Sequence, residues 1–145
     1  MSGINLLTIL IYYQMKREIK FRGKRNSLLK GWVYGSLITA ENSVDGNTYI
    51  VTKEFDLRDF NCHTVYVRVK PETVGQYTQL KDKNGLEIFE GDLLKIDDGD
   101  PVEVRYEGIY ASFGIWRNGF SFLHYFHEYI EPENCEVIGN IHYLK

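Results

Sequence analysis

Cysteine is scarce in this sequence, and long apolar runs are missing from it. The two cysteines, Cys62 and Cys135, lie far apart and form no C-x-x-C pair, which argues against a disulfide framework, a metal ribbon or a dithiol redox pair. No segment approaches the roughly 18 consecutive apolar residues that are needed to cross a bilayer. We therefore expect a soluble, cytoplasmic protein with no membrane partner.

Signatures of nucleotide-driven and nucleophilic enzymes are also missing. The 13 glycines are scattered along the chain, and none of them begins a phosphate-binding G-x-x-x-x-G-K followed by Ser or Thr. There is no G-x-S-x-G, and Cys62 directly precedes His63, which is not a Cys-His catalytic arrangement. We assign no catalytic residue and no cofactor, and we expect a protein that is not an enzyme.

Candidate metal ligands are few and poorly spaced. His124 and His127 are three residues apart, so on a strand their side chains would point to opposite faces. The aspartates between residues 92 and 100 offer carboxylate oxygens that suit a divalent cation, but a hairpin loop needs such residues in any case. We assign no metal site, and a small metal-dependent hydrolase built on these aspartates is the weakest of three hypotheses on function.

The sequence does contain a strong period of two. Short segments alternate apolar and polar residues, and a helical period is not sustained anywhere. In the clearest segment, Thr64 to Lys70, the residues Val65, Val67 and Val69 would share one face, and Pro71 would end the strand. Further short strands are expected at residues 19–21, 32–38 and 49–52. The pattern predicts a mostly β protein built from small antiparallel sheets.

Turn signals divide the second half into hairpins. Asn-Gly, the strongest short hairpin signal, occurs at Asn84-Gly85 and at Asn118-Gly119, and residues 97–101 form a third turn, Asp-Asp-Gly-Asp-Pro. The expected strands are residues 77–80, 86–89, 93–96, 102–106, 112–117, 120–126 and 135–143. The five strands that follow Gly91-Asp92 predict a small closed or nearly closed antiparallel barrel of the SH3-like kind, because closure removes exposed sheet edges.

A chain of 145 residues can form one domain or two small sub-domains that share a face. We expect an N-terminal β sub-domain, residues 15–72, packed on a C-terminal SH3-like barrel sub-domain, residues 73–145. Residues 1–14 contain the apolar run INLLTILIYY without the basic residues or the cleavage site of a signal peptide. We expect them to be an N-terminal extension upstream of a start at Met15; an ordinary edge strand or helix is the alternative.

Basic residues concentrate near the N-terminus of a chain whose net charge is −3. Seven basic residues and one acidic residue lie between Met15 and Lys30, and the rest of the chain is strongly acidic. The acidic remainder disfavours nucleic-acid binding by the whole surface, but a local basic strip could contact phosphates. The candidate nucleic-acid-binding residues are Lys16, Arg17, Lys20, Arg22, Lys24 and Arg25. The alternative is an exposed strand whose basic side chains face water.

Aromatic residues make up 14% of the chain and crowd between residues 106 and 129. Exposed aromatic side chains on a small barrel can grip a peptide, stack on bases or seal an oligomer interface. The candidate partner-binding residues are Tyr110, Trp116, Tyr125 and Tyr129. The alternative is that these side chains fill a small core, because small β proteins depend on large side chains.

Three blocks of the sequence match the pattern of a known family. The central block is residues 72–92, ETVGQYTQLKDKNGLEIFEGD, and it is flanked by residues 17–24, REIKFRGK, with 31–35, GWVYG, and by residues 136–141, EVIGNI. In these blocks the chain resembles the YopX-type family of phage and prophage proteins. The central block departs from the family at Gln79, where the family usually has glycine.

The resemblance implies a phage or prophage origin, a bacterial host cytoplasm and a mostly β fold with a barrel-like C-terminal part. It implies no activity, so no functional residue is carried over from the family. We favour a non-enzymatic accessory module that binds a host or phage protein through its barrel surface, with a homo-oligomer as a further option. A nucleic-acid-associated protein that uses the basic strip is the alternative.

Overall fold

The structure is a computed structural model, and it describes residues 18–28, 30–39, 47–117, 121–126 and 130–143. The expected extension at residues 1–14, the expected start at Met15 and the turn Asn118-Gly119 lie outside these residues. No helix in the described part of the chain has the length and apolar character that a bilayer crossing requires.

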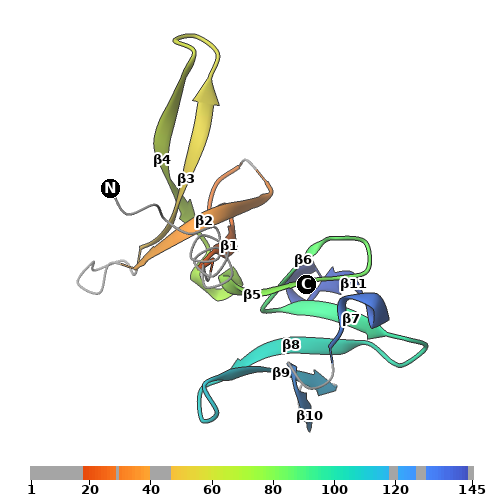
Figure 1. Ribbon diagram of the computed structural model, residues 1–145. Helices are drawn as coiled ribbons and strands as arrows, with labels where there is room; N and C mark the ends of the chain where they lie inside the picture. The colour runs from red at the N-terminus through yellow and green to blue at the C-terminus, as the bar shows by residue number, and fades with distance from the viewer. Residues whose placement is uncertain (1–17, 29, 40–46, 118–120, 127–129, 144–145) are drawn as a thin grey trace, which may run out of the picture.

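The first sheet contains six antiparallel strands in the order β4-β3-β2-β1-β5-β6 (Figure 1). They are β1 (Phe21–Lys24), β2 (Trp32–Thr39), β3 (Thr48–Asp56), β4 (Asn61–Val69), β5 (Gly75–Lys81) and β6 (Glu87–Phe89). The hairpin of β3 and β4 projects away from the body of the molecule (Figure 1). A bridge between Arg25 and Val69 brings the base of β4 back to the end of β1, so this sheet curls on itself.

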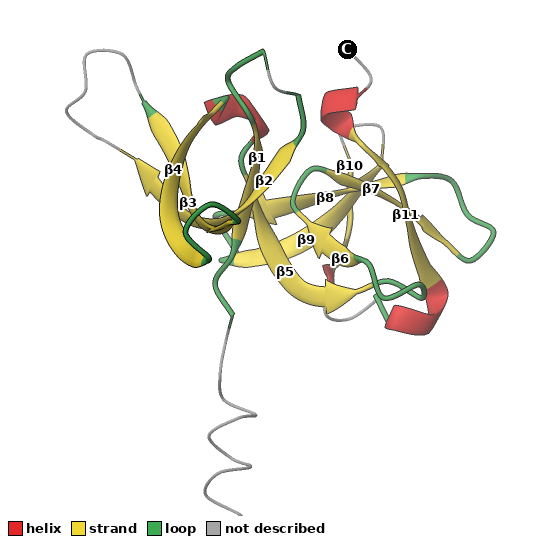
Figure 2. Ribbon diagram, turned by 90° about the horizontal axis from the view of Figure 1, so that it is seen from above, coloured by secondary structure: helices red, strands yellow, loops and turns green. Residues whose placement is uncertain are grey.

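The second sheet contains five antiparallel strands in the order β10-β9-β8-β7-β11. They are β7 (Asp92–Ile96), β8 (Val102–Glu107), β9 (Ser112–Arg117), β10 (Ser121–Tyr125) and β11 (Cys135–Asn140). The described residues also contain three short 3₁₀ turns, Pro71–Thr73, Pro132–Asn134 and Ile141–Tyr143 (Figure 2). The prediction of a mostly β protein with small antiparallel sheets is confirmed.

The alternating pattern of β4 behaves as predicted. Val67 and Val69 are buried, while Tyr66 and Arg68 are exposed. The buried valines pack with Val33 and Ile50 into a core under the first sheet. A larger core lies under the second sheet and contains Ile88, Leu94, Ile96, Val102, Val104, Ile115, Phe126, Ile130 and Cys135.

The predicted hairpins are also present. β5 and β6 pair on either side of Asn84-Gly85, and Gly85 has the positive φ of 79° that the turn requires. Residues 97–101 connect β7 to β8, which pair with each other. The last strand is shorter than predicted, because the Asn140 side chain accepts a hydrogen bond from the His142 N–H at 2.9 Å and turns the chain into a 3₁₀ turn.

The strand pairings leave the second sheet open. Within the described residues, β10 pairs with β9 and β11 with β7, and no pairing joins β10 to β11. A closed or nearly closed barrel was expected in the C-terminal part of the chain. It is the first sheet that curls on itself, through the bridge between Arg25 and Val69. The SH3-like barrel and the division of the chain at residue 73 stay predictions.

β5 and β6 connect the two sheets. β5 pairs with β1, placing Gly75 opposite Arg22, while Ile88 of β6 is part of the core under the second sheet. The contact at the crossing is tight, since a Cβ atom at Gly75 would lie only 2.4 Å from the Glu90 carbonyl oxygen. Residues of β1 and β2 therefore lie close to the start of β7.

Gln79 lies at an irregularity in β5. The register with β6 steps from Tyr77 opposite Phe89 to Lys81 opposite Glu87, so β5 has extra residues there. Gln79 adopts a φ of 72°, a left-handed conformation that costs a residue with a side chain about 1–2 kcal/mol. The backbone thus keeps the conformation that glycine prefers, although this chain has glutamine.

Replacing Gln79 by glycine is expected to raise the free energy of unfolding by about 0.5–1 kcal/mol, because relief of the left-handed strain exceeds the entropy that glycine adds to the unfolded chain. Urea denaturation measures the change. The matched control is Gln76→Gly in the regular part of β5, which should lower stability by a similar amount. Equal losses in both variants would contradict the argument.

Candidate binding pocket between the two sheets

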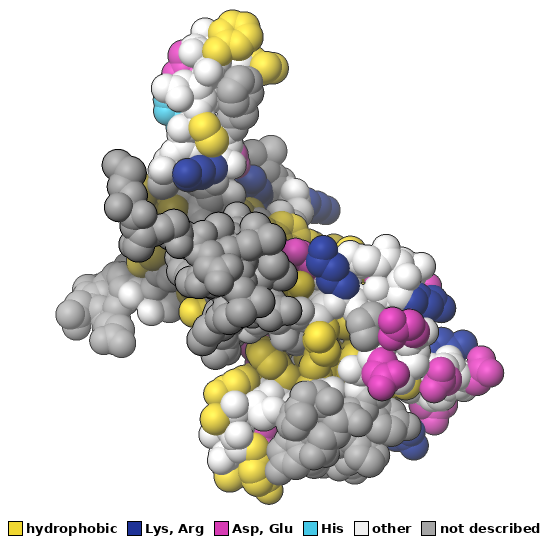
Figure 3. Space-filling view, viewed as in Figure 1, with side chains coloured by type: hydrophobic (Ala, Val, Ile, Leu, Met, Phe, Trp, Pro, Cys, Tyr) yellow, Lys and Arg dark blue, Asp and Glu magenta, His cyan; other side chains and the backbone are white. Residues whose placement is uncertain are grey.

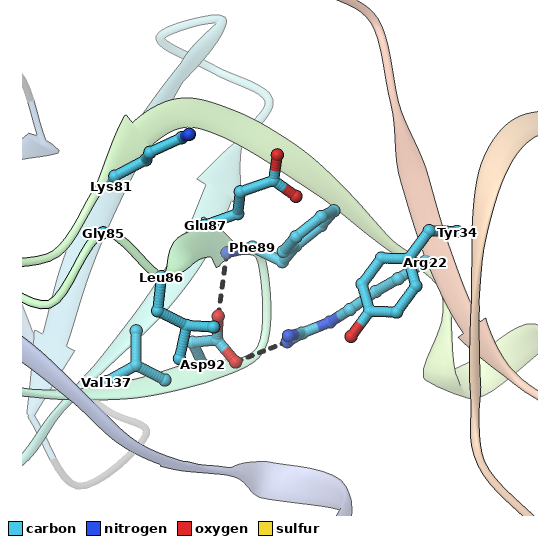
Figure 4. Close-up of a pocket in the computed structure, with 9 residues that line it drawn as sticks. All are labelled: Arg22, Tyr34, Lys81, Gly85, Leu86, Glu87, Phe89, Asp92 and Val137. Carbon is cyan, nitrogen blue, oxygen red and sulfur yellow. Dashed lines mark hydrogen bonds and ion pairs between the residues drawn. The ribbon is translucent and has the colours of Figure 1, made fainter.

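A pocket of about 420 Å³ opens where the two sheets meet (Figure 4). β1 and β2 contribute Arg22 and Tyr34, and Phe89 and Asp92 come from the end of β6 and the start of β7. The other lining residues are Lys81, Gly85, Leu86, Glu87 and Val137. The pocket thus combines residues from both sheets.

The floor of the pocket is a buried ion pair. Arg22 Nη2 lies 2.5 Å from Asp92 Oδ1, and the two side chains are 8% and 1% exposed. Asp92 Oδ2 accepts a hydrogen bond from the Phe89 N–H at 2.8 Å (Figure 4), and Oδ1 accepts one from Asn140 Nδ2 at 3.3 Å. The ion pair therefore joins β1 of the first sheet to β7 and β11 of the second.

Two aromatic rings enclose the guanidinium of Arg22. Its central carbon lies 4.6 Å from the centre of the Trp32 ring and 4.8 Å from that of Phe89. Cation–π contacts of this kind are stronger where water is excluded. Arg22 Nε is buried without a hydrogen-bond partner among the described residues, so the group depends strongly on Asp92 for compensation of its charge.

Leu86 and Val137 form an apolar wall, and Asp82 positions both of them. Asp82 Oδ1 accepts hydrogen bonds from the N–H groups of Asn84 and Leu86, both at 2.9 Å. Its Oδ2 accepts one from the Val137 N–H at 3.0 Å. Burial opposes ionisation, but the backbone donors outweigh it and lower the pKa of the Asp82 carboxyl below its ordinary value. The ionised carboxylate ties the β5–β6 turn to β11.

Tyr34 stands on the opposite side of the pocket from that wall (Figure 4). Its ring meets Phe89 edge-on, with 5.5 Å between the ring centres. Burial raises the pKa of the Tyr34 hydroxyl, so this group stays protonated at neutral pH and can donate a hydrogen bond. The tyrosine supplies both apolar surface and one polar group.

The charges around the pocket are mostly cancelled. Glu87 Oε1 lies 2.5 Å from Lys20 Nζ at the rim, and Arg22 and Asp92 neutralise each other on the floor. Lys81 is exposed and forms no ion pair with any described residue. Lys20 Nζ also lies 3.3 Å from Glu18 Oε1. The pocket therefore has apolar walls and a neutral floor, with Lys81 as a further basic residue at its rim, opposite Glu87 in the strand register.

The side chains of the pocket that carry titratable groups are Arg22, Tyr34, Lys81, Glu87 and Asp92. The lining residues include no serine, cysteine or histidine that could act as a nucleophile or proton carrier. The buried thiol of Cys135 belongs to the core of the second sheet, and burial raises its pKa to about 11. A thiol with such a pKa stays protonated and unreactive at neutral pH.

The basic residues of the N-terminal strip have partners within the chain. Lys20 pairs with Glu87, Arg22 is buried against Asp92, and Arg25 Nη2 lies 3.3 Å from Glu54 Oε1. Lys24 Nζ donates to the His142 carbonyl at 2.7 Å and lies 4.2 Å from the centre of the Tyr143 ring. Lys16 and Arg17 lie outside the described residues. The described basic residues of the strip thus all have contacts within the chain, and a role of the strip in nucleic-acid binding stays a prediction.

The candidate aromatic residues do not line the pocket. Tyr110 is 56% exposed in the β8–β9 turn. Figure 3 shows hydrophobic side chains at the surface at the lower left of the view, where Figure 1 places this turn. Trp116 of β9 is half-buried, and the Arg105 guanidinium lies 5.3 Å from its ring centre. Tyr125 ends β10, but its side chain and all of Tyr129 lie outside the described residues.

The acidic residues separate into two places. Asp92 forms the pocket floor, whereas Asp97, Asp98 and Asp100 lie exposed in the β7–β8 turn. The outer end of the β3–β4 hairpin carries a group of possible metal ligands that the sequence analysis missed. The ligand atoms of Asp56, Asp59 and His63 lie within 4.8 Å of one another there. Both carboxylate oxygens of Asp56 already accept hydrogen bonds from Arg58. His124 lies in β10 without a described side chain, and His127 lies outside the described residues.

Sequence reasoning also missed the pocket itself. Arg22 and Asp92 line it, but Arg22 was assigned to phosphate contacts and Asp92 was considered as a metal ligand, so neither was expected to form an ion pair. One local feature of the sequence could have pointed to the pocket wall. The Asp82-Lys-Asn-Gly sequence indicates that an aspartate side chain caps the β5–β6 turn. Nothing in the spacing of residues 22 and 92 indicates that they meet.

Removing one partner of the buried ion pair should be costly. Asp92→Ala is expected to lower the free energy of unfolding by about 3–5 kcal/mol, because it leaves the Arg22 charge buried and uncompensated. The double variant Arg22→Met/Asp92→Ala should lose less than the sum of the single losses, and urea denaturation of all four proteins gives the coupling energy. Glu54→Ala, which breaks the exposed pair with Arg25, is the control and should cost about 0–1 kcal/mol. Additive losses at Arg22 and Asp92 would contradict the assignment.

The Asp82 carboxylate should stabilise the fold in a pH-dependent way. Its folded pKa is lowered, so its contribution is complete above the ordinary aspartate pKa of about 4 and is lost as the pH falls through the folded value. Asp82→Asn is expected to be less stable than the wild type at pH 7, by about 1–3 kcal/mol, with a difference that shrinks in acid. Denaturation at several pH values measures this; a difference that does not change with pH would refute it, and Asp98→Asn in the exposed turn is the control.

Comparison with known proteins agrees with the resemblance found in the sequence. The family model described as YopX protein matches residues 20–143, which is most of the chain and includes every residue that lines the pocket. No curated protein matches the chain. On this match, together with its mostly β architecture, the chain belongs to the YopX family.

Proposed function

We propose that this member of the YopX family is a non-enzymatic binding module whose pocket between the sheets holds an apolar or aromatic side chain of a protein partner. One observation carries the proposal: the charges on the pocket floor cancel, while Leu86, Val137 and Tyr34 offer apolar surface above them. Pockets with apolar walls and a few placed polar groups are typical ligand sites.

The charges define the chemistry of the preferred anchor. A charged anchor would lose its water above a floor that offers no free counter-charge, so a neutral side chain is favoured. Lys81 at the rim lacks an acidic partner in the described part of the chain. It therefore favours an Asp or Glu next to the anchor in the partner's sequence.

One anchor is not enough for a stable complex, because burying a single large apolar side chain contributes about 1.5–3 kcal/mol. The β8–β9 turn provides a second contact, with Ile109 86% exposed and Tyr110 56% exposed. We propose that Tyr110 extends the binding surface over the C-terminal sub-domain, the part predicted to be SH3-like. Trp116, Tyr125 and Tyr129 complete the proposed partner-binding set.

The proposed partner is a host or phage protein in the bacterial cytoplasm, in keeping with the phage and prophage origin that the family resemblance implies. Nucleic acid is the less favoured partner, since Lys20, Arg22 and Arg25 each pair with a carboxylate of the same chain. A hydrolase built on the aspartates is disfavoured because Asp92 is committed to the ion pair.

Selection of a displayed library of random peptides on the purified protein tests the proposal. Peptides with an apolar or aromatic residue beside Asp or Glu are expected to be enriched. Leu86→Asp should weaken their binding at least about tenfold, because it places a carboxylate on the apolar wall next to the proposed acidic residue. Isothermal titration calorimetry measures the affinities.

Ile138→Asp is the matched control, since Ile138 is 48% exposed and Leu86 is 54% exposed, but Ile138 does not line the pocket. Its affinity for the enriched peptides should equal that of the wild type. Equal losses in both variants, or no enrichment of such peptides, would refute the proposal. Binding of single-stranded DNA at low salt that is lost in Lys20→Ala, without peptide binding, would favour the nucleic-acid alternative.

A further inference from the structure

The outer half of β4 presents an open strand edge. The Arg68 carbonyl accepts a hydrogen bond from the Asn26 N–H, and the Lys70 N–H donates to the Lys24 carbonyl, both at 2.9 Å. These groups therefore point away from β3. Because the direction alternates along an antiparallel strand, the backbone groups of Thr64 and Tyr66 also point away from β3.

No described residue pairs with these outward groups of Thr64 and Tyr66. The bridge to β1 ends at the base of the strand, at Val69. Nearer the tip, the Cys62 N–H is occupied by the Asn61 side chain at 2.9 Å. Among the described residues, the open edge thus consists of the Cys62 carbonyl and the outward groups of Thr64 and Tyr66.

This edge lacks the usual protection against pairing. Natural edge strands carry proline, lysine or inward-pointing charges that prevent association. The open segment, Cys-His-Thr-Val-Tyr, contains none of these, and the Tyr66 side chain beside it is 64% exposed. The regular register of β3 with β4 continues to Asp56 opposite Asn61, so the hairpin presents the edge without a bulge.

We propose that the β4 edge pairs antiparallel with the β4 edge of a second copy of this chain, about a two-fold axis near Thr64. In this arrangement each Thr64 faces the same residue of the other copy, and Cys62 faces Tyr66. In each copy both outward groups of Thr64 and the N–H of Tyr66 gain partners, while the Tyr66 carbonyl faces a Cys62 N–H that the Asn61 side chain occupies. The two first sheets become one continuous sheet.

The charges of the hairpin fit a second copy in this orientation. The tip carries Asp59, whose carboxylate contacts His63 Nε2 at 2.6 Å, while the base carries the exposed Arg68 and Lys70. Arg58, the basic residue of the tip, is already held by Asp56. An antiparallel pair places the acidic tip of one hairpin beside the basic base of the other, which favours this orientation over a parallel one.

Sedimentation velocity over a concentration series tests the proposal. The wild type is expected to shift from monomer to dimer below about 1 mM. Thr64→Lys should weaken the dimer at least about tenfold, because two like charges then face each other across the axis. The matched control is Ser36→Lys on the inner strand β2, which adds the same charge to an exposed position of the same sheet and should leave the dimer unchanged.

Amide hydrogen exchange supplies a readout that does not depend on a variant folding correctly. The amides of Thr64 and Tyr66 should become protected as the wild-type concentration rises, whereas those of His63 and Val65, which point to β3, should not change. A monomer at all concentrations, a dimer insensitive to Thr64→Lys, or protection of Thr64 and Tyr66 that is independent of concentration would overturn the proposal. The last result would mean that the edge is covered by the same chain.

Discussion

The buried ion pair between Arg22 and Asp92 is the interaction on which the arrangement of the two sheets depends. It joins strands that lie 70 residues apart in the sequence. Two charges can be buried together only where other groups replace their water, and the Phe89 N–H, the Asn140 amide and the ring of Trp32 do so here. The same contacts that hold the sheets together therefore also create the neutral floor of the pocket.

Asp82 extends this arrangement to the pocket wall. A carboxylate is the side chain best suited to accept several backbone N–H groups at once, and Asp82 uses this capacity on both the β5–β6 turn and β11. Leu86 is thus held at the pocket although it belongs to an exposed turn. The pocket is consequently ordered by contacts within the chain, which would reduce the entropy cost of binding the proposed partner.

The two proposed surfaces lie at opposite ends of the first sheet. β4 is one edge of this sheet, and β6, which contributes Glu87 and Phe89 to the pocket, is the other (Figure 1). Association of two copies through β4 would therefore leave both pockets open. A dimer of this kind would present two anchor sites, and two linked sites bind a repeated or dimeric partner more tightly than one.

Local sequence determined the strands and turns, and tertiary structure decided what they build. Val65, Val67 and Val69 defined a strand because side chains alternate between faces, and Asn84-Gly85 defined a turn because glycine tolerates positive φ. Both signals act between neighbours in the chain. Burial of Arg22 and formation of the pocket depend on contacts between distant segments. A lysine or arginine in an alternating strand has the same local sequence pattern whether its side chain faces water or a buried aspartate. Gln79 shows the same division: its left-handed backbone is imposed by the register of β5 with β6, against the preference of the residue itself.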